Sequence, residues 1–284
     1  MKIGIGLPNQ IRDVRPGVLP EWARRAEEAG FSTLGSVGRI AYPGVMDTVA
    51  LAAAAGATSR IGLLSTVLLG PVWPALLVAK EAAGIDGVSG GRLTLGVGLG
   101  GRPDDFVVEG LGARGTGRRL DEDIEAYRKV WRGEVPDGCD NPLVPAGTRE
   151  VPLLFGGGVP ASFERVARSG RGYIGASLPP AMVGPAFEGV REAWLRAGRK
   201  GSPYLVAIAY FAVADPEAGT RAVHDYYTTA GPEAAGLLAS TVRGGAEQIK
   251  EVVRAFEGLG ADELVLNPTG DDLDEVARLA EIVL

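Results

Sequence analysis

Two periodicities alternate along this 284-residue chain. Short, mostly apolar runs, as expected for strands of a buried parallel sheet, are separated by longer segments with apolar residues three or four positions apart, as in amphipathic helices. The second period is clearest at Leu120, Ile124, Tyr127 and Trp131. The pattern predicts strands over residues 2–7, 33–37, 61–67, 93–98, 151–155, 172–176, 204–213 and 263–266. It predicts helices over residues 19–29, 45–55, 74–86, 120–131, 160–168, 182–197, 216–229, 232–241, 246–259 and 272–283.

The order of these elements predicts the fold class. Each predicted strand is followed by at least one helix, which is typical of an α/β protein and of a (β/α)₈ TIM barrel. The same alternation is compatible with a doubly wound open sheet. The count of strands and the lack of a domain-splitting linker favour the barrel, formed as a single domain over residues 1–284.

Composition excludes several function classes. The net charge of −6 leaves no basic stripe for phosphates, so no nucleic-acid partner is expected. No apolar run approaches the length needed to span a bilayer, and Met1 leads directly into a strand, so we expect no membrane partner, no signal peptide and a cytoplasmic location. A single cysteine, Cys139, excludes an internal disulfide framework and a cysteine-based metal site.

The predicted carboxyl ends of the strands, where barrel active sites form, carry few titratable groups. They have no histidine, no cysteine and no carboxylate cluster, which argues against a metal site, a nucleophilic triad or a paired-carboxylate hydrolase. Glycine, of which the whole chain has 43, is instead abundant at these strand ends. A neutral, glycine-lined mouth suits an enzyme whose cofactor supplies the reactive atoms.

Two glycine motifs follow predicted strands. Gly156, Gly157 and Gly158 precede a helix that begins near Pro160, an arrangement that exposes N–H groups to a phosphate, although a plain turn is the alternative. Gly96-x-Gly98-x-x-Gly101 formally matches the dinucleotide fingerprint. Its context does not fit, because Arg102 and a proline follow instead of an immediate helix.

Several charged residues have two interpretations each. Arg118 and Arg119 begin a predicted helix, where they could reach a phosphate or remain solvated. Asp104 and Asp105 are either loop caps or proton donors near a cofactor. His224, on a helix remote from any strand end, is interpreted as a surface or packing residue.

A family resemblance is carried by segments distributed over nearly the whole chain. They are Lys2–Pro8, Ala26–Phe31, Thr58–Gly62, Pro74–Ala79, Ser89–Gly98, Val151–Gly158 and Gly244–Pro268. Together they resemble the luciferase-like (bacterial luciferase) family of flavin- and F420-dependent oxidoreductases, and Ser89–Gly98 resembles its central signature.

The resemblance implies a TIM barrel with FMN or the deazaflavin F420 at its mouth. The ring would lie against the third strand end, often at a non-proline cis peptide, which matches Thr66–Val67 here with Ser65 beside it. The phosphate would lie on the three-glycine loop, with an arginine contact from Arg118 or Arg119. The predicted cofactor-binding set is therefore Ser65, Thr66, Val67, Gly100, Arg118, Gly156, Gly157, Gly158 and Ser177.

Two departures from the family pattern affect the expected chemistry. Many members place an acidic residue and a histidine after the second strand, where this chain has Gly38 and Arg39. FMN-binding luciferases carry an arginine in the fourth-strand loop, where this chain has Leu99. F420 is therefore the first choice of cofactor and FMN the second.

We expect an oxidoreductase that acts on a small organic substrate, by hydride transfer or monooxygenation. Arg39 would orient an anionic or carbonyl group of the substrate, and Asp104 is the second predicted catalytic residue. The alternative is a catalytically degenerate barrel that binds a flavin or apolar ligand without turnover. A homodimer is the one expected protein assembly.

Overall fold

The computed structural model describes residues 1–107, 112 and 114–284, and its centre is a closed parallel barrel. All strand pairs are parallel, in the order β3-β2-β1-β9-β8-β7-β6-β5-β4, and a pairing of β3 with β5 closes the sheet. The strands are β1 (Lys2–Gly6), β2 (Thr33–Ser36), β3 (Gly62–Ser65), β4 (Leu68–Leu69), β5 (Leu93–Gly98), β6 (Leu153–Gly156), β7 (Gly172–Ile174), β8 (Tyr204–Phe211) and β9 (Glu263–Pro268). The closure confirms the predicted (β/α)₈ barrel, because an open sheet would leave β3 and β5 as edges.

Nine strands make eight barrel positions because one predicted strand is interrupted. Strands β3 and β4 together occupy the predicted 61–67 segment and its continuation, and both pair with β5. The peptide bond between Thr66 and Val67, which separates them, is cis. The cis bond lies at the position that the family resemblance implies.

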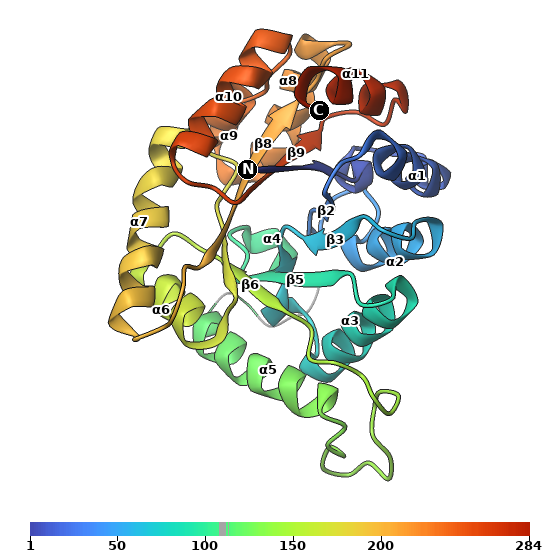
Figure 1. Ribbon diagram of the computed structural model, residues 1–284, viewed down its shortest axis with the longest axis vertical. Helices are drawn as coiled ribbons and strands as arrows, with labels where there is room; N and C mark the ends of the chain where they lie inside the picture. Colours follow the sequence, from blue (N-terminus) through green and yellow to red (C-terminus); the bar gives the residue numbers. More distant parts are fainter. Residues whose placement is uncertain (108–111, 113) are drawn as a thin grey trace.

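Helices cover the outside of the barrel (Figure 1). The layer consists of α1 (Leu19–Ala29), α2 (Asp47–Ala57), α3 (Ala75–Ser89), α5 (Thr116–Trp131), α6 (Pro160–Ser169), α7 (Pro180–Arg196), α10 (Ala246–Gly258) and α11 (Asp274–Val283). Three further helices lie in strand–helix connections: α4 (Pro103–Val107) after β5, and α8 (Pro216–Tyr227) and α9 (Pro232–Ala239) after β8. None of the helices in the described ranges combines the length and the apolarity that crossing a membrane requires.

Local sequence explains these elements. In α1, Trp22 and Ala26 are buried on one face, and Gly30 ends the helix at φ 98°, donating its N–H to the carbonyls of Ala26 and Glu27. A left-handed residue at this position favours glycine. In β8, by contrast, almost every residue is buried, because the sheet is covered on both faces.

The barrel interior is filled at mid-height and lined with glycine above. A cluster of aliphatic side chains from β3, β6, β7, β8 and β9 forms the filling. Its members are Leu64, Leu154, Ile174, Val206, Ile208 and Val265. Toward the carboxyl ends of the strands, the inward positions include Gly6, Gly98 and Gly156, so the mouth is lined largely by backbone. Function therefore concentrates at this end.

Candidate functional site

The floor of the mouth is formed by Val67 and two glycines. A Cβ atom built on Gly98 would lie 2.6 Å from Cγ2 of Val67, and one built on Gly156 would lie 3.5 Å from Cγ1 of the same side chain. Glycine is thus required at position 98, where any side chain would displace Val67. The predicted cofactor residues Val67 and Gly156 are therefore brought together beside Gly98, and both are partly exposed.

Ser65 and Thr66 use their hydroxyls inside the protein. Ser65 Oγ donates to the carbonyl of Gly96 at 2.8 Å and accepts from the Gly96 N–H at 2.9 Å. Thr66 Oγ1 donates to the carbonyl of Ser36 at 2.9 Å. Both side chains are buried, so they fix the backbone on either side of the floor. Contact of Ser65 and Thr66 with a cofactor stays a prediction. Because both hydroxyls are engaged within the protein, such a contact would have to be made by the backbone of this segment.

The three-glycine loop has the geometry of an anion site. Gly157 has φ +128°, and a Cβ atom there would lie 2.8 Å from Cβ of Ser162. A Cβ atom on Gly158 would meet nothing within 4 Å. Within the described ranges, no acceptor is recorded for the N–H groups of Gly157 and Gly158, which precede the positive end of the α6 dipole. This arrangement can receive a phosphate.

Two other predicted cofactor residues lie outside this floor and loop. Arg118 has a side chain that is 86% exposed and pairs with Glu122 at 3.8 Å on the same helix. Gly100 occupies a turn at φ +79°, where an added Cβ would touch Leu69 and Phe106 at 3.4 Å. The structure thus places Gly100 beside the mouth, whereas the contact expected of Arg118 requires its exposed side chain to fold back over the α5 terminus.

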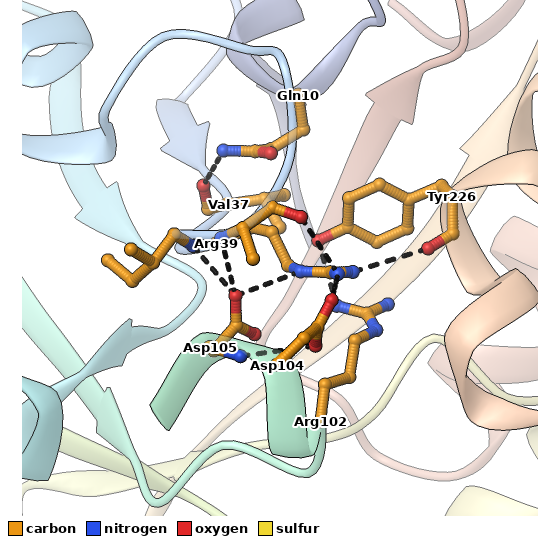
Figure 2. A network of polar contacts seen from close by, with 9 residues as sticks. Gln10, Val37, Arg39, Arg102, Asp104, Asp105 and Tyr226 are labelled. Carbon is orange, nitrogen blue, oxygen red and sulfur yellow. Dashed lines mark hydrogen bonds and ion pairs between the residues drawn. The ribbon is translucent and has the colours of Figure 1, made fainter. Parts of the chain in front are cut away.

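Arg39 is enclosed by hydrogen-bond acceptors (Figure 2). Its side chain is 1% exposed and pairs with Asp104 and Asp105, with Nε lying 2.9 Å from Oδ1 of Asp105. It also donates to the carbonyls of Ala41 and Tyr226. All three guanidinium nitrogens have partners, so Arg39 holds other residues in place, and the substrate contact expected from sequence receives no support.

Asp105 connects the loop after β2 to helix α4. Its Oδ1 accepts from Arg39 and from the backbone N–H groups of Ile40 and Ala41, each at 2.9 Å. Asp104, the predicted catalytic acid, accepts from Arg39 and from the N–H of Asp105. Both carboxylates therefore serve as acceptors within one network that joins the β2 and β5 loops.

A cluster of tyrosines from β8 and α8 covers one side of the mouth. Tyr226 and Tyr227 stack edge to face, with centroids 4.9 Å apart, and the hydroxyls of Tyr227 and Tyr210 are 3.0 Å apart. Ser177, the last of the predicted cofactor residues, lies near the Tyr210 hydroxyl. Burial raises the pKa of Tyr210 and of Tyr226 above the usual value, so both hydroxyls stay protonated at neutral pH.

Arg102 reaches the same cluster from the β5 loop (Figure 2). Its guanidinium carbon lies 4.3 Å from the ring centroid of Tyr226 and 4.6 Å from that of Tyr227. Nη1 donates to the Tyr226 hydroxyl at 3.2 Å. Burial acts to lower the pKa of this arginine, but its contacts with the tyrosines outweigh that effect and raise the pKa above its usual value.

Asn267 is the most isolated polar side chain at the mouth. It is 3% exposed, and neither its Oδ1 nor its Nδ2 has a hydrogen-bond partner among the described residues. It lies opposite Tyr210 in the β8–β9 ladder. Both residues line a cavity of about 30 Å³ beneath α8, together with Gln10, Tyr42 and others, which has room for about one water molecule. Buried amides rarely remain unpaired, so Asn267 is a candidate ligand contact.

Sequence reasoning missed most of this side of the mouth. The sequence identified Asn267 only as a residue at a strand end, and Arg102 only as a residue that does not fit the dinucleotide motif. Tyr226 lies 124 residues from Arg102 in the chain, and no local pattern connects the two. His224, interpreted as a surface residue, is exposed on α8. The described ranges contain no group of three or more metal-binding side chains.

Comparison with known proteins gives one family. The family model described as luciferase-like monooxygenase matches residues 1–263. An uncharacterised protein of Mycobacterium tuberculosis is 33% identical over 176 residues, covering 52% of this chain and 61% of the relative. The oxygenase component of a flavin-dependent trigonelline monooxygenase from Acinetobacter baylyi is 25% identical over 264 residues, covering 74% of this chain and 70% of the relative. The chain spans about three fifths of the length of the first of these curated relatives.

Solved structures agree on the fold. An F420-dependent secondary alcohol dehydrogenase, in complex with an F420–acetone adduct, superposes with a TM-score of 0.80 at 18% identity, covering 99% of this chain and 98% of the other. The oxygenating constituent of 3,6-diketocamphane monooxygenase from Pseudomonas putida, in complex with FMN, gives 0.74 at 17% identity, covering 99% and 95%. One of these similar structures thus carries F420 and the other FMN.

Proposed function

Because this chain belongs to the luciferase-like monooxygenase family, we propose that it is an F420- or FMN-dependent oxidoreductase acting on a small organic substrate by hydride transfer or monooxygenation. We place F420 first, since Leu99 stands where the family resemblance expects an FMN-binding arginine. The observation that carries the proposal is the glycine-lined mouth, with its apolar floor at Val67 and its open N–H groups at Gly157 and Gly158.

The residues present fit such a coenzyme. Gly98 and Gly156 keep the floor free of side chains, so a flat ring system can lie against Val67. The N–H groups of Gly157 and Gly158 would hold the phosphate, with the α6 dipole adding to the attraction. When bound, either coenzyme supplies a ring that exchanges a hydride, and FMN in addition can react with oxygen.

The remaining residues position and shield that ring. The network of Arg39, Asp104 and Asp105 fixes two mouth loops against each other. The tyrosines of β8 and α8 limit water on one side, and their protonated hydroxyls can donate hydrogen bonds. The protein's contribution is therefore binding, orientation and exclusion of water, while the coenzyme carries the redox chemistry.

Titration of the purified protein with FMN and with F420, followed by fluorescence, tests the proposal. We expect saturable binding of at least one coenzyme, and Gly158→Asp to weaken it about tenfold or more, because the new carboxylate would face the phosphate. The open space around Gly158 predicts normal folding of this variant. Gly245→Asp, which adds the same charge before α10, is the matched control and should bind normally.

The outcomes separate the candidate functions. No binding of either coenzyme at millimolar concentration contradicts the proposal. Binding without reduction or oxidation of the coenzyme by any candidate substrate supports instead the non-catalytic barrel. Equal affinity of Gly158→Asp and wild type contradicts the assignment of the phosphate to the three-glycine loop.

A further inference from the structure

Arg102 has unused hydrogen-bonding capacity at the barrel mouth. A guanidinium offers five N–H donors in a planar fork, and a single hydrogen bond, to the neutral Tyr226 hydroxyl, is recorded for this one within the described ranges. No carboxylate in those ranges lies within ion-pair distance of it. Arg39, whose guanidinium also lies near the Tyr226 ring, differs because it pairs with both Asp104 and Asp105.

The tyrosines hold the guanidinium without neutralising it. The rings of Tyr226 and Tyr227 lie against Arg102 at 4.3 and 4.6 Å from centroid to guanidinium carbon. Ring contacts of this kind fix the orientation of the fork and leave its edge available for an acceptor. A half-buried cation held against two rings, with one recorded hydrogen bond, is suited to receive a planar anion in two parallel hydrogen bonds.

Further donors lie next to Arg102. The hydroxyls of Tyr227 and Tyr210 share one hydrogen bond, and Ser177 adds another hydroxyl at Tyr210. Asn267, opposite Tyr210 in the sheet, has an amide with two unpaired atoms. These groups form a polar row from the barrel interior to the β5 loop. All of them except the hydroxyl that donates within the Tyr210–Tyr227 pair can donate a hydrogen bond to an oxygen-bearing ligand.

We propose that Arg102, supported by Tyr226 and Tyr227, is the subsite for an oxyanion of the substrate, a carboxylate or an enolate. This proposal rests on the proposed function for the identity of the site. It assigns the oxyanion to the substrate because the predicted phosphate loop follows β6, whereas the contacts of Arg102 are with α8. Strand β7 separates β6 from β8, the strand that leads to α8.

Calorimetric titration with benzoate, and with neutral benzamide as its uncharged counterpart, tests this subsite without requiring turnover. We expect the wild-type protein, coenzyme-loaded or coenzyme-free, to bind benzoate in preference to benzamide. Arg102→Gln should weaken benzoate binding about 10- to 100-fold and leave benzamide binding unchanged, because a charge-assisted hydrogen-bond pair is lost. Arg221→Gln, which removes an exposed arginine from α8, the helix that carries Tyr226 and Tyr227, should bind as wild type.

Arg102→Lys provides the second variant if the glutamine variant does not fold. It keeps the charge but loses the planar fork, so benzoate binding should weaken several-fold. Benzoate affinity unchanged in both variants, or no saturable benzoate binding by the wild type at millimolar concentration, overturns the proposal. Weaker FMN or F420 binding in Arg102→Gln, with benzoate binding unchanged, would place the oxyanion on the coenzyme instead. Because the coenzyme-free arm is read separately, failure of coenzyme binding remains a distinct result.

Discussion

Two arginines at the barrel mouth differ in what surrounds them. Arg39 is enclosed by two carboxylates and two carbonyls, whereas Arg102 lies against tyrosine rings, and one hydrogen bond is recorded for it among the described residues. A buried guanidinium that uses four of its five donors within the protein stabilises loops and has little capacity left for a ligand. The surroundings therefore assign structural positioning to Arg39 and ligand contact to Arg102.

Replacement of Arg39 by glutamine tests its positioning role. We expect the free energy of unfolding to fall by about 3–5 kcal/mol, because the buried Asp105 carboxylate loses its charged partner. Urea denaturation measures this loss. Arg12→Gln, which removes an exposed arginine paired with Asp225, is the control and should change stability little. Equal, small effects of the two substitutions would show that the Arg39 network does not hold the loops.

Sequence alone placed some residues at the barrel mouth but did not reveal the partners of others. Val67, Gly156, Gly157 and Gly158 could be predicted because strand ends and glycine runs are local patterns. The partners of Arg39 could not, since Asp105 lies 66 positions away and the contact depends on how two loops meet. A charged residue at a strand end therefore indicates the site, while its partners decide its role.

At the scale of elements, α2 begins with a buried acid. Asp47 is buried, its Oδ1 accepts from the N–H of Thr48, and its Oδ2 has no partner among the described residues. Burial raises the pKa of Asp47 to about 6 from an ordinary value of 3.8. The native protein thus retains this proton between pH 4 and 6, where the unfolded chain releases it, so stability falls as pH rises through that window.

Asp47→Asn should remove that pH dependence. A pKa shift of about two units corresponds to about 3 kcal/mol in the free energy of unfolding. The variant should be more stable than wild type by this amount at pH 7 but not at pH 4. Burial likewise raises the pKa of Asp123 to about 6. The stability of Asp47→Asn should therefore still fall somewhat as pH rises, and only the double variant with Asp123→Asn should lose this dependence. Urea denaturation at several pH values measures these differences. Lower stability of Asp47→Asn at pH 7 would contradict the assignment.

The loop before α6 provides a matched glycine pair. Gly157→Ala should lower the free energy of unfolding by about 1–3 kcal/mol, because alanine disfavours φ +128° and its Cβ would press on Ser162. Gly158→Ala should be nearly neutral, since its Cβ meets nothing within 4 Å. Thermal unfolding of the two variants checks the difference. Equal stabilities would indicate that the loop does not hold the conformation described.

The elements themselves were largely predictable, and their interruptions were not. The helix over Leu19–Ala29 begins and ends where its apolar period and Gly30 predict. The predicted 61–67 strand is divided at Thr66–Val67, and α4 was missed because five residues are too few to show a helical period. Such short irregular segments lie at the mouth, where function overrides local pattern.

For the whole molecule, the closed barrel has two distinct regions: a middle filled by aliphatic side chains, and a mouth at the carboxyl ends of the strands that is lined largely by backbone. The aliphatic filling supports the floor at Val67 from below, and α8 with its tyrosines covers part of the mouth from above. A coenzyme bound there should stabilise the native state, by about 2.7 kcal/mol at a concentration 100 times Kd. The melting temperature should therefore rise with FMN or F420 concentration, and an unchanged melting temperature at saturating coenzyme would contradict binding to the folded barrel.

The expected homodimer remains a prediction at the same scale. Sedimentation velocity of the purified protein measures it directly. A single species of about 59 kDa, twice the 29.4 kDa chain, would support the dimer, and a monomer at all concentrations would contradict it.

The central claim is that a glycine-lined mouth holds a redox ring by its face and its phosphate by backbone N–H groups. A crystal structure of the protein with FMN or F420 bound tests it most directly. The account predicts the ring against Val67, between Gly98 and Gly156, and the phosphate within hydrogen-bonding distance of the N–H groups of Gly157 and Gly158. A coenzyme located elsewhere, or held through its phosphate by side chains distant from this loop, would contradict the account.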